Sequence, residues 1–98
     1  MLINFTGDGV AVNDTLRDYT LKKFKRLENR GDNITKINVI MNINKLQQIA
    51  EATLHVSGKD IHARSETADM YNSIDELVDK LERQIIKHKE KIKGHHED

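Results

Sequence analysis

Apolar residues recur at every second position from Ile37 to Ile43, as Ile37, Val39, Met41 and Ile43. Successive side chains of a β-strand point to opposite faces, so this spacing predicts a strand with one buried face. Such a strand is stable only in a sheet whose apolar face is covered by another layer. The rest of the chain must therefore supply both partner strands and a covering layer.

Three other segments are predicted to supply the partner strands. The same period of two appears in residues 52–56 and begins again at Ile61, which predicts two further strands. Gly58-Lys59 lies between them and is expected to form a tight turn. Residues 2–6 are predicted to form a short strand that ends at Gly7. The charged residues 64–67 are expected to form a loop.

Two segments with helical periodicity are predicted to supply the covering layer. The first begins after Asn13 as its N-cap, extends to about Asn29, and has Gly31 beyond its end. The second is capped by Thr67 or Asp69 and extends to about Ile92. The predicted fold is α+β with the order β-α-β-β-β-α, in which two helices pack on one face of a four-stranded, mostly antiparallel sheet. The residues expected on the buried helical faces are Leu16, Thr20, Phe24, Leu27, Ile74, Leu77, Val78, Leu81, Ile85 and Ile92.

Length and composition predict one intracellular domain. The 98 residues suit a single core, which we expect over residues 1–93, with a flexible tail over residues 94–98. The absence of cysteine excludes disulfides and thiolate metal sites. No apolar run approaches the length of a membrane span, and the N-terminus does not resemble a signal peptide. We therefore expect a cytoplasmic protein, monomeric by itself, with no membrane partner.

The formal net charge of zero hides a segregation of charge. Residues 13–30 carry a net charge of +3 and residues 80–93 a net charge of +4, so the remainder carries −7. Both basic segments coincide with predicted helices. Long cationic side chains at regular spacing on rigid helices suit the phosphates of a nucleic acid. The candidate RNA-binding residues are Arg17, Lys22, Lys23, Arg26, Arg30, Lys80, Arg83, Lys87, Lys89 and Lys91.

A solvated helix face explains part of this pattern equally well. Glu76 and Lys80, like Asp79 and Arg83, are spaced to form favourable ion pairs four residues apart. Lys91, in contrast, has no acidic residue three or four positions away, so its repulsion of Lys87 would be offset by a polyanion. No aromatic platform for splayed bases is evident, which predicts recognition of RNA shape and phosphate rather than sequence.

Other constellations give weaker signals. If Gly58-Lys59 forms a two-residue turn, His55 and His62 face each other across the hairpin and could supply two ligands to zinc or copper, with His95 or His96 as further candidates. The alternative is two exposed strand histidines. Asp75 and Asp79 are more simply surface acids in ion pairs than an acid–base pair. No activated nucleophile or glycine-rich phosphate loop is present, so no catalysis and no cofactor are expected.

Several motifs resemble the ribosome hibernation promoting factor family, also called the protein Y family. They span nearly the whole chain: Arg17, Lys23, Phe24, Arg26, Leu27 and Glu28; Ala52-Thr53-Leu54-His55-Val56; Ile61-His62-Ala63; Asp69-Met70-Tyr71 with Ile74-Asp75; and Asp79-Lys80-Leu81-Glu82-Arg83-Gln84 with Lys87-His88-Lys89. The resemblance implies a fold similar to double-stranded RNA-binding domains. It also implies that Arg17, Lys23, Arg26, Lys80, Arg83, Lys87 and Lys91 face ribosomal RNA, with Lys22, Arg30 and Lys89 as further contacts.

The resemblance carries expectations about function as well. Members of the family bind the small ribosomal subunit in the channel used by messenger RNA and by transfer RNA at the A and P sites, and they block translation in stationary phase. The chain resembles the short members, which would help a separate ribosome modulation factor to assemble inactive ribosome dimers. The alternatives from the residues alone are a stand-alone duplex-RNA-binding module or RNA chaperone, and a metal-binding protein that uses His55 and His62.

Overall fold

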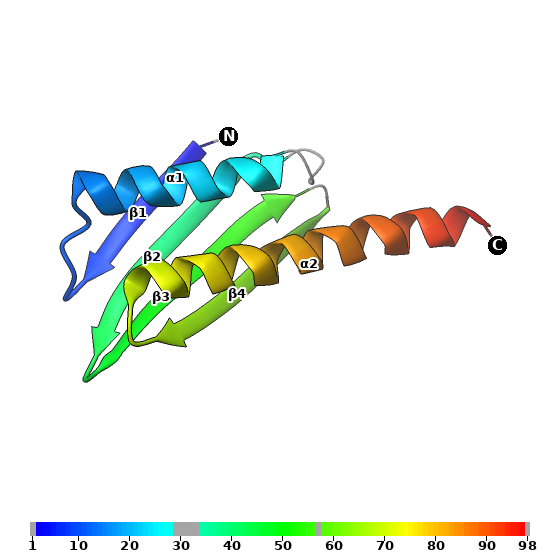
Figure 1. Cartoon of the computed structure of the whole chain (residues 1–98). Helices are drawn as coiled ribbons and strands as arrows, with labels where there is room; N and C mark the ends of the chain where they lie inside the picture. The colour runs from blue at the N-terminus through cyan, green and yellow to red at the C-terminus, as the bar shows by residue number, and fades with distance from the viewer. Residues whose placement is uncertain (1, 29–33, 57, 98) are drawn as a thin grey trace.

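The computed structural model describes the backbone of residues 2–28, 34–56 and 58–97, and side chains within these ranges as far as Glu90. The elements follow the predicted order, as β1 (Leu2–Asp8), α1 (Asp14–Glu28), β2 (Lys36–Asn44), β3 (Gln47–Val56), β4 (Lys59–Thr67) and α2 (Met70–Glu97). Both helices lie side by side on one face of the sheet (Figure 1). The predicted α+β architecture is therefore confirmed.

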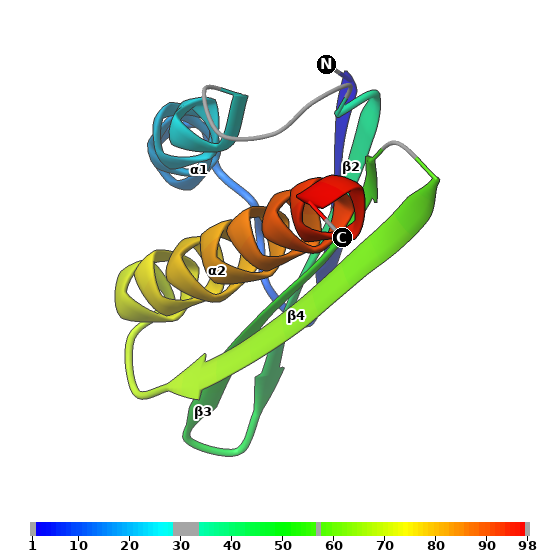
Figure 2. The ribbon, with the colours of Figure 1, turned by 90° about the vertical axis from the view of Figure 1, so that its right-hand side faces the viewer.

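The four strands form one sheet in the order β1-β2-β3-β4. β1 and β2 are parallel, and α1 crosses over between them, whereas β2, β3 and β4 form an antiparallel meander. β1 and β4 are consequently the two edge strands. Viewed along the second helix, α2 lies over the β3–β4 side of the sheet, and α1 lies beside it (Figure 2).

The core lies between the sheet and the two helices. The register aligns Ile37 with Leu54 and Leu54 with Ile61, so the strand residues with a period of two form one apolar face. Phe24 of α1 and Leu81 of α2 are fully buried against this face. The predicted buried residues of both helices are confirmed up to Ile85, while the side chain of Ile92 lies outside the described part of the chain.

Both helices begin at a side-chain cap. The Asn13 side-chain oxygen accepts a hydrogen bond of 2.8 Å from the backbone N–H of Leu16, as the sequence predicted. For α2, the Asp69 carboxylate accepts a hydrogen bond of 3.1 Å from the backbone N–H of Tyr71. Asp69 is therefore the cap of α2.

Three sequence predictions about boundaries were wrong. β4 continues to Thr67, so residues 64–67 are part of a strand rather than a loop. Val56 pairs with Lys59, so the β3–β4 turn lies one residue earlier than Gly58-Lys59. The backbone of α2 continues to Glu97, past the expected end near Ile92. Gly31 lies outside the described residues, and the division at residue 93 stays a prediction.

Candidate nucleic-acid interface

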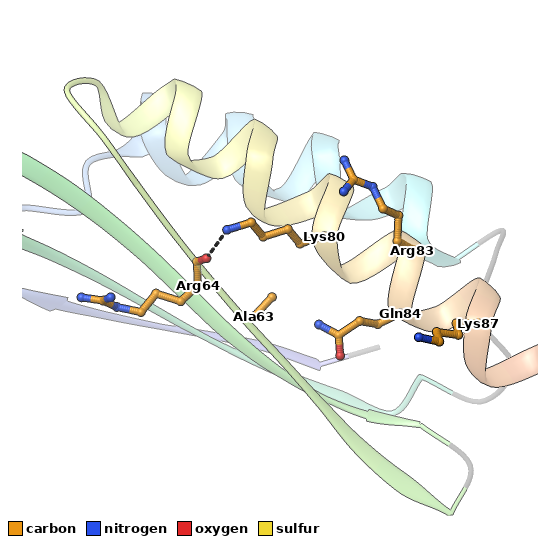
Figure 3. A pocket seen from close by; sticks show the side chains of 6 residues that line it. All are labelled: Ala63, Arg64, Lys80, Arg83, Gln84 and Lys87. Carbon is orange, nitrogen blue, oxygen red and sulfur yellow. Dashed lines mark hydrogen bonds between the residues drawn. The ribbon is translucent and has the colours of Figure 1, made fainter.

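A groove of about 460 Å³ runs between α2 and the edge strand β4. Its walls contain four basic side chains, one amide side chain and no acidic residue (Figure 3). The lining residues are Ala63, Arg64, Lys80, Arg83, Gln84 and Lys87. Lys80, Gln84 and Lys87 lie on the same side of α2 because they are separated by four and three residues. The groove thus presents hydrogen-bond donors and positive charge to solvent.

Two of these side chains contact the backbone of β4. The Lys80 ammonium group donates a hydrogen bond of 2.7 Å to the carbonyl of Arg64 (Figure 3). The Gln84 amide donates a hydrogen bond of 2.8 Å to the carbonyl of His62. Both carbonyls lie on the outer edge of β4, which has no neighbouring strand in the described sheet. Lys80 is thereby positioned by the fold, although its side chain stays exposed.

The cations of Arg83 and Lys87 make no such contacts. Both side chains are exposed, and none of the described acidic groups or carbonyls contacts either of them. The ion pair that the sequence allowed between Asp79 and Arg83 is replaced, because Asp79 pairs with α1 instead. An unpaired cation keeps its full charge for an anionic ligand. Arg83 and Lys87 are therefore the groove residues best suited to bind phosphate.

The seam between the two helices is held by ion pairs. Arg26 of α1 contacts Asp79 at 2.6 Å and Glu82 at 3.4 Å, both on α2. Lys23 of α1 contacts Asp75 at 3.4 Å. The expectation that Asp75 and Asp79 are surface acids in ion pairs is confirmed. Lys23 and Arg26, predicted as RNA contacts, thus also join α1 to α2.

Tyr19 strengthens the same seam. Its hydroxyl donates a hydrogen bond of 2.6 Å to Asp75, and its ring makes an edge-to-face contact with Tyr71 at 4.9 Å between ring centroids. The hydrogen bond to Asp75, together with desolvation and the negative charge of this carboxylate, raises the pKa of Tyr19 to about 12. Nothing in the sequence pattern indicated this pair, because helical periodicity does not specify which residues of two helices meet.

The remaining predicted cations are spread over the helical layer. The Arg17 guanidinium lies 5.8 Å from the centre of the Phe5 ring, on the β1 side of α1. Lys22 is exposed on α1, and Lys89 is half-buried on α2. Arg30 and the side chain of Lys91 lie outside the described residues. The structure therefore gathers Lys80, Arg83 and Lys87 in one groove and places Arg17 on the opposite flank.

The two strand histidines are not directly opposite each other. His55 aligns with Asp60 and His62 with Thr53, since the turn lies one residue earlier than predicted. Each histidine instead contacts a carboxylate, as His55 pairs with Asp60 and His62 lies 3.4 Å from Glu51. Among the described residues, no group of three or more histidine, cysteine or acidic side chains could hold a metal ion. Neither helix, within the same residues, has an apolar stretch long enough to cross a membrane.

Comparison with known proteins decides the family. Residues 3–93 match the family described as Sigma 54 modulation protein / S30EA ribosomal protein. The chain belongs to this family. The match covers α1, α2 up to residue 93, and the four strands from residue 3 onward. The resemblance to hibernation promoting factors is thereby confirmed.

Curated relatives within this family share close to half of the sequence. The ribosome hibernation promoting factor of Azotobacter vinelandii is 54% identical over 91 residues, which cover 93% of this chain and 85% of the relative. That of Escherichia coli strain K12 is 44% identical over 95 residues, which cover 97% of this chain and 100% of the relative.

Solved structures show the same S30EA fold. A ribosomal subunit interface protein from Coxiella burnetii superposes with a TM-score of 0.84 at 39% identity, covering 91% of this chain and 98% of the other. The N-terminal domain of Thermus thermophilus protein Y superposes with a TM-score of 0.84 at 30% identity, covering 90% of this chain and 99% of the other.

Proposed function

We propose that this chain is a ribosome hibernation factor that binds the ribosomal RNA of the small subunit and thereby stops translation in stationary phase. The observation that carries the proposal is the groove between α2 and β4, in which Lys80, Arg83 and Lys87 gather without an acidic residue among the lining. The names of the relatives support the same role, since the similarity extends over nearly the whole chain.

The proposed binding position is the channel that carries messenger RNA and the A-site and P-site transfer RNAs. A folded domain in this channel would block all three ligands by occupying their volume, and no chemical step is needed. We further propose that the chain acts in the cytoplasm as a monomer, without a cofactor, and that it works with a separate ribosome modulation factor in forming inactive ribosome dimers.

Co-sedimentation with purified small subunits tests the groove. The double variant Arg83→Glu/Lys87→Glu reverses two exposed charges and should lose binding, because phosphate would meet negative charge at the same positions. The matched control is Lys36→Glu/Lys45→Glu, which makes the same change in net charge at two exposed positions outside the groove. Wild-type binding by the groove variant would contradict the proposed interface.

The salt dependence of the affinity measures the electrostatic contribution to binding of small subunits. If the groove contacts phosphates, log affinity should fall linearly with log salt, with a slope of roughly 0.7 to 0.9 for each phosphate neutralised. The Arg83→Glu variant should reduce this slope. An affinity that does not change with salt would contradict a phosphate interface.

Competition tests the position on the ribosome. P-site transfer RNA added in excess should displace the wild-type chain from small subunits, and the chain should inhibit translation of a reporter in a purified system. A gel shift on generic duplex RNA addresses the alternative of a stand-alone RNA-binding module. Equal affinity for duplex RNA and for small subunits would favour that alternative.

A further inference from the structure

Asp79 of α2 lies within reach of two arginines that could pair with it. Around a helix of about 3.6 residues per turn, Arg83 lies about 40° beyond Asp79, and the groove residue Lys87 lies about 40° beyond Arg83. In the sequence of α2, Arg83 is the only cation three or four positions from Asp79, and Asp79 is the only acid three or four positions from Arg83. The helix by itself therefore favours a pair between Asp79 and Arg83.

Arg26 of α1 holds this carboxylate instead. Its Nη2 donates a hydrogen bond of 2.6 Å to Asp79, and its Nε lies 3.4 Å from Glu82. A planar guanidinium can serve two carboxylates at once, which favours Arg26 over Arg83 as the partner of Asp79. Among the described residues, Asp79 forms no other ion pair, and Arg83 contacts no acidic group.

The neighbouring cation of α1 is engaged elsewhere. The Lys23 ammonium group lies 3.4 Å from Asp75 and 5.4 Å from the centre of the Tyr19 ring. These contacts hold Lys23 one turn nearer the start of α2 than Asp79. The separation of Asp79 from Arg83 therefore depends on Arg26.

Resting on the proposed function, we propose that Arg26 is a positioning residue for RNA binding, because it holds Asp79 at the seam and thereby keeps Arg83 free for phosphate. Without Arg26, the Asp79 carboxylate would lie beside Arg83 at the spacing of a favourable pair. Arg83 would then have to leave an ion pair before it could bind RNA. In this arrangement α1 contributes to RNA binding through the charges of α2.

The variant Arg26→Gln tests this role through its affinity for purified small subunits at low salt. Affinity should fall about two- to fourfold, because a pair four residues apart is worth roughly a factor of two and a carboxylate about 7 Å from bound phosphate adds a comparable factor. Circular dichroism verifies the fold of each variant. Arg26→Met, which keeps an apolar stem, serves if Arg26→Gln is unfolded.

Restoration by a second change separates positioning from direct contact. Arg26→Gln/Asp79→Asn removes the freed carboxylate and should regain most of the lost affinity. The matched control, Arg26→Gln/Asp60→Asn, has the same net charge, but Asp60 pairs with His55 on the sheet face opposite the helices. The control should stay close to Arg26→Gln, since the charge that it removes is remote from the groove.

A background without Arg83 shows which cation carries the effect. In Arg83→Gln, the further change Arg26→Gln should cost little affinity, because no phosphate is then held beside Asp79. The inference is overturned by any of four results: no loss in Arg26→Gln, no restoration by Asp79→Asn, equal restoration by Asp60→Asn, or an undiminished loss in the Arg83→Gln background.

Nuclear magnetic resonance of the free chain tests the pairing without RNA. The Arg83 Nε–H signal, assigned by its loss in Arg83→Gln, should shift in Arg26→Gln and return toward its wild-type position in Arg26→Gln/Asp79→Asn. An Arg83 signal that does not change in Arg26→Gln would overturn the role of Arg26. The proposed function fails separately, if the wild-type chain does not bind small subunits.

Discussion

The side chain of Gln84 donates a hydrogen bond of 2.8 Å to the backbone carbonyl of His62, which lies 22 residues earlier on an edge strand. Lys80 makes the equivalent bond of 2.7 Å to the carbonyl of Arg64, two residues farther along β4. Alternate residues of an edge strand direct their backbone groups outward, where another strand could pair with them. α2 therefore covers the edge of β4 with its own side chains.

Removing both donors should uncover this edge. The variant Lys80→Met/Gln84→Met keeps the length of the side chains and loses the two hydrogen bonds. We expect it to self-associate at high concentration through β4, and its free energy of unfolding should fall by about 1 kcal/mol for each lost hydrogen bond. Analytical ultracentrifugation over a range of concentrations measures the self-association. A variant that stays monomeric throughout, like the control Arg83→Met/Lys87→Met, would show that these bonds do not protect the edge.

Tyr19 should ionise at unusually high pH. The chain has two tyrosines, so Tyr71→Phe leaves Tyr19 as the only source of tyrosinate absorbance. We expect its titration midpoint near 12, and the additional change Asp75→Asn should lower the midpoint toward 10, because Asp75 accepts the hydrogen bond of the neutral hydroxyl. A midpoint near 10 in the single variant would contradict the Tyr19–Asp75 hydrogen bond.

The same hydrogen bond links stability to alkaline pH. The folded chain holds the Tyr19 proton more tightly than the unfolded chain, since its pKa is raised from 10.0 to about 12. The stabilisation is fully present below pH 10 and is lost as the pH rises toward 12. Urea unfolding across this pH range should show a decline in the free energy of unfolding of the wild-type chain. The part of this decline that is due to Tyr19 should be absent in Tyr19→Phe. Parallel curves for the two proteins would contradict the linkage.

The cap of α1 should contribute measurably to stability. Replacing Asn13 by Ala removes the acceptor for the backbone N–H of Leu16, and the free energy of unfolding should fall by about 1 kcal/mol. Asn13→Asp retains an acceptor at the same position and should stay close to wild type. Chemical unfolding at neutral pH compares the three proteins. Equal losses in Asn13→Ala and Asn13→Asp would indicate that the side-chain amide, rather than capping, matters.

Sequence periodicity was sufficient to predict the layers of this fold. The period of two in β2 and the helical period of α2 identify the buried faces, because the direction of a side chain follows from the geometry of each element alone. Ile43, the last residue of the period in β2, is nevertheless 41% exposed. The end of β4 was missed because residues 64–67 are all charged or polar, including the inward-facing Ser65. It nevertheless occupies the buried position after Ala63 and is 1% exposed, so its location in the strand outweighs its polarity.

The candidate site was less predictable than the fold. Helical spacing correctly brought Lys80 and Lys87 onto one side of α2, since this depends on a single element. Whether a cation is free or paired depends instead on how two elements pack. The sequence offered Asp79 as a partner for Arg83, yet Arg26 of α1 reaches Asp79 across the seam and takes the acid that Arg83 would otherwise use.

The parallel pairing of β1 with β2 also affects how the chain is made. A translating ribosome releases β1 first, but Leu2 pairs with Lys36 and Asp8 with Asn42, so the partner strand emerges more than thirty residues later. Two strands alone are only marginally stable in water, and lasting pairing requires β3 as well. β1 must therefore stay unpaired until β2 and β3 have emerged, and the sheet forms around β2 rather than outward from β1.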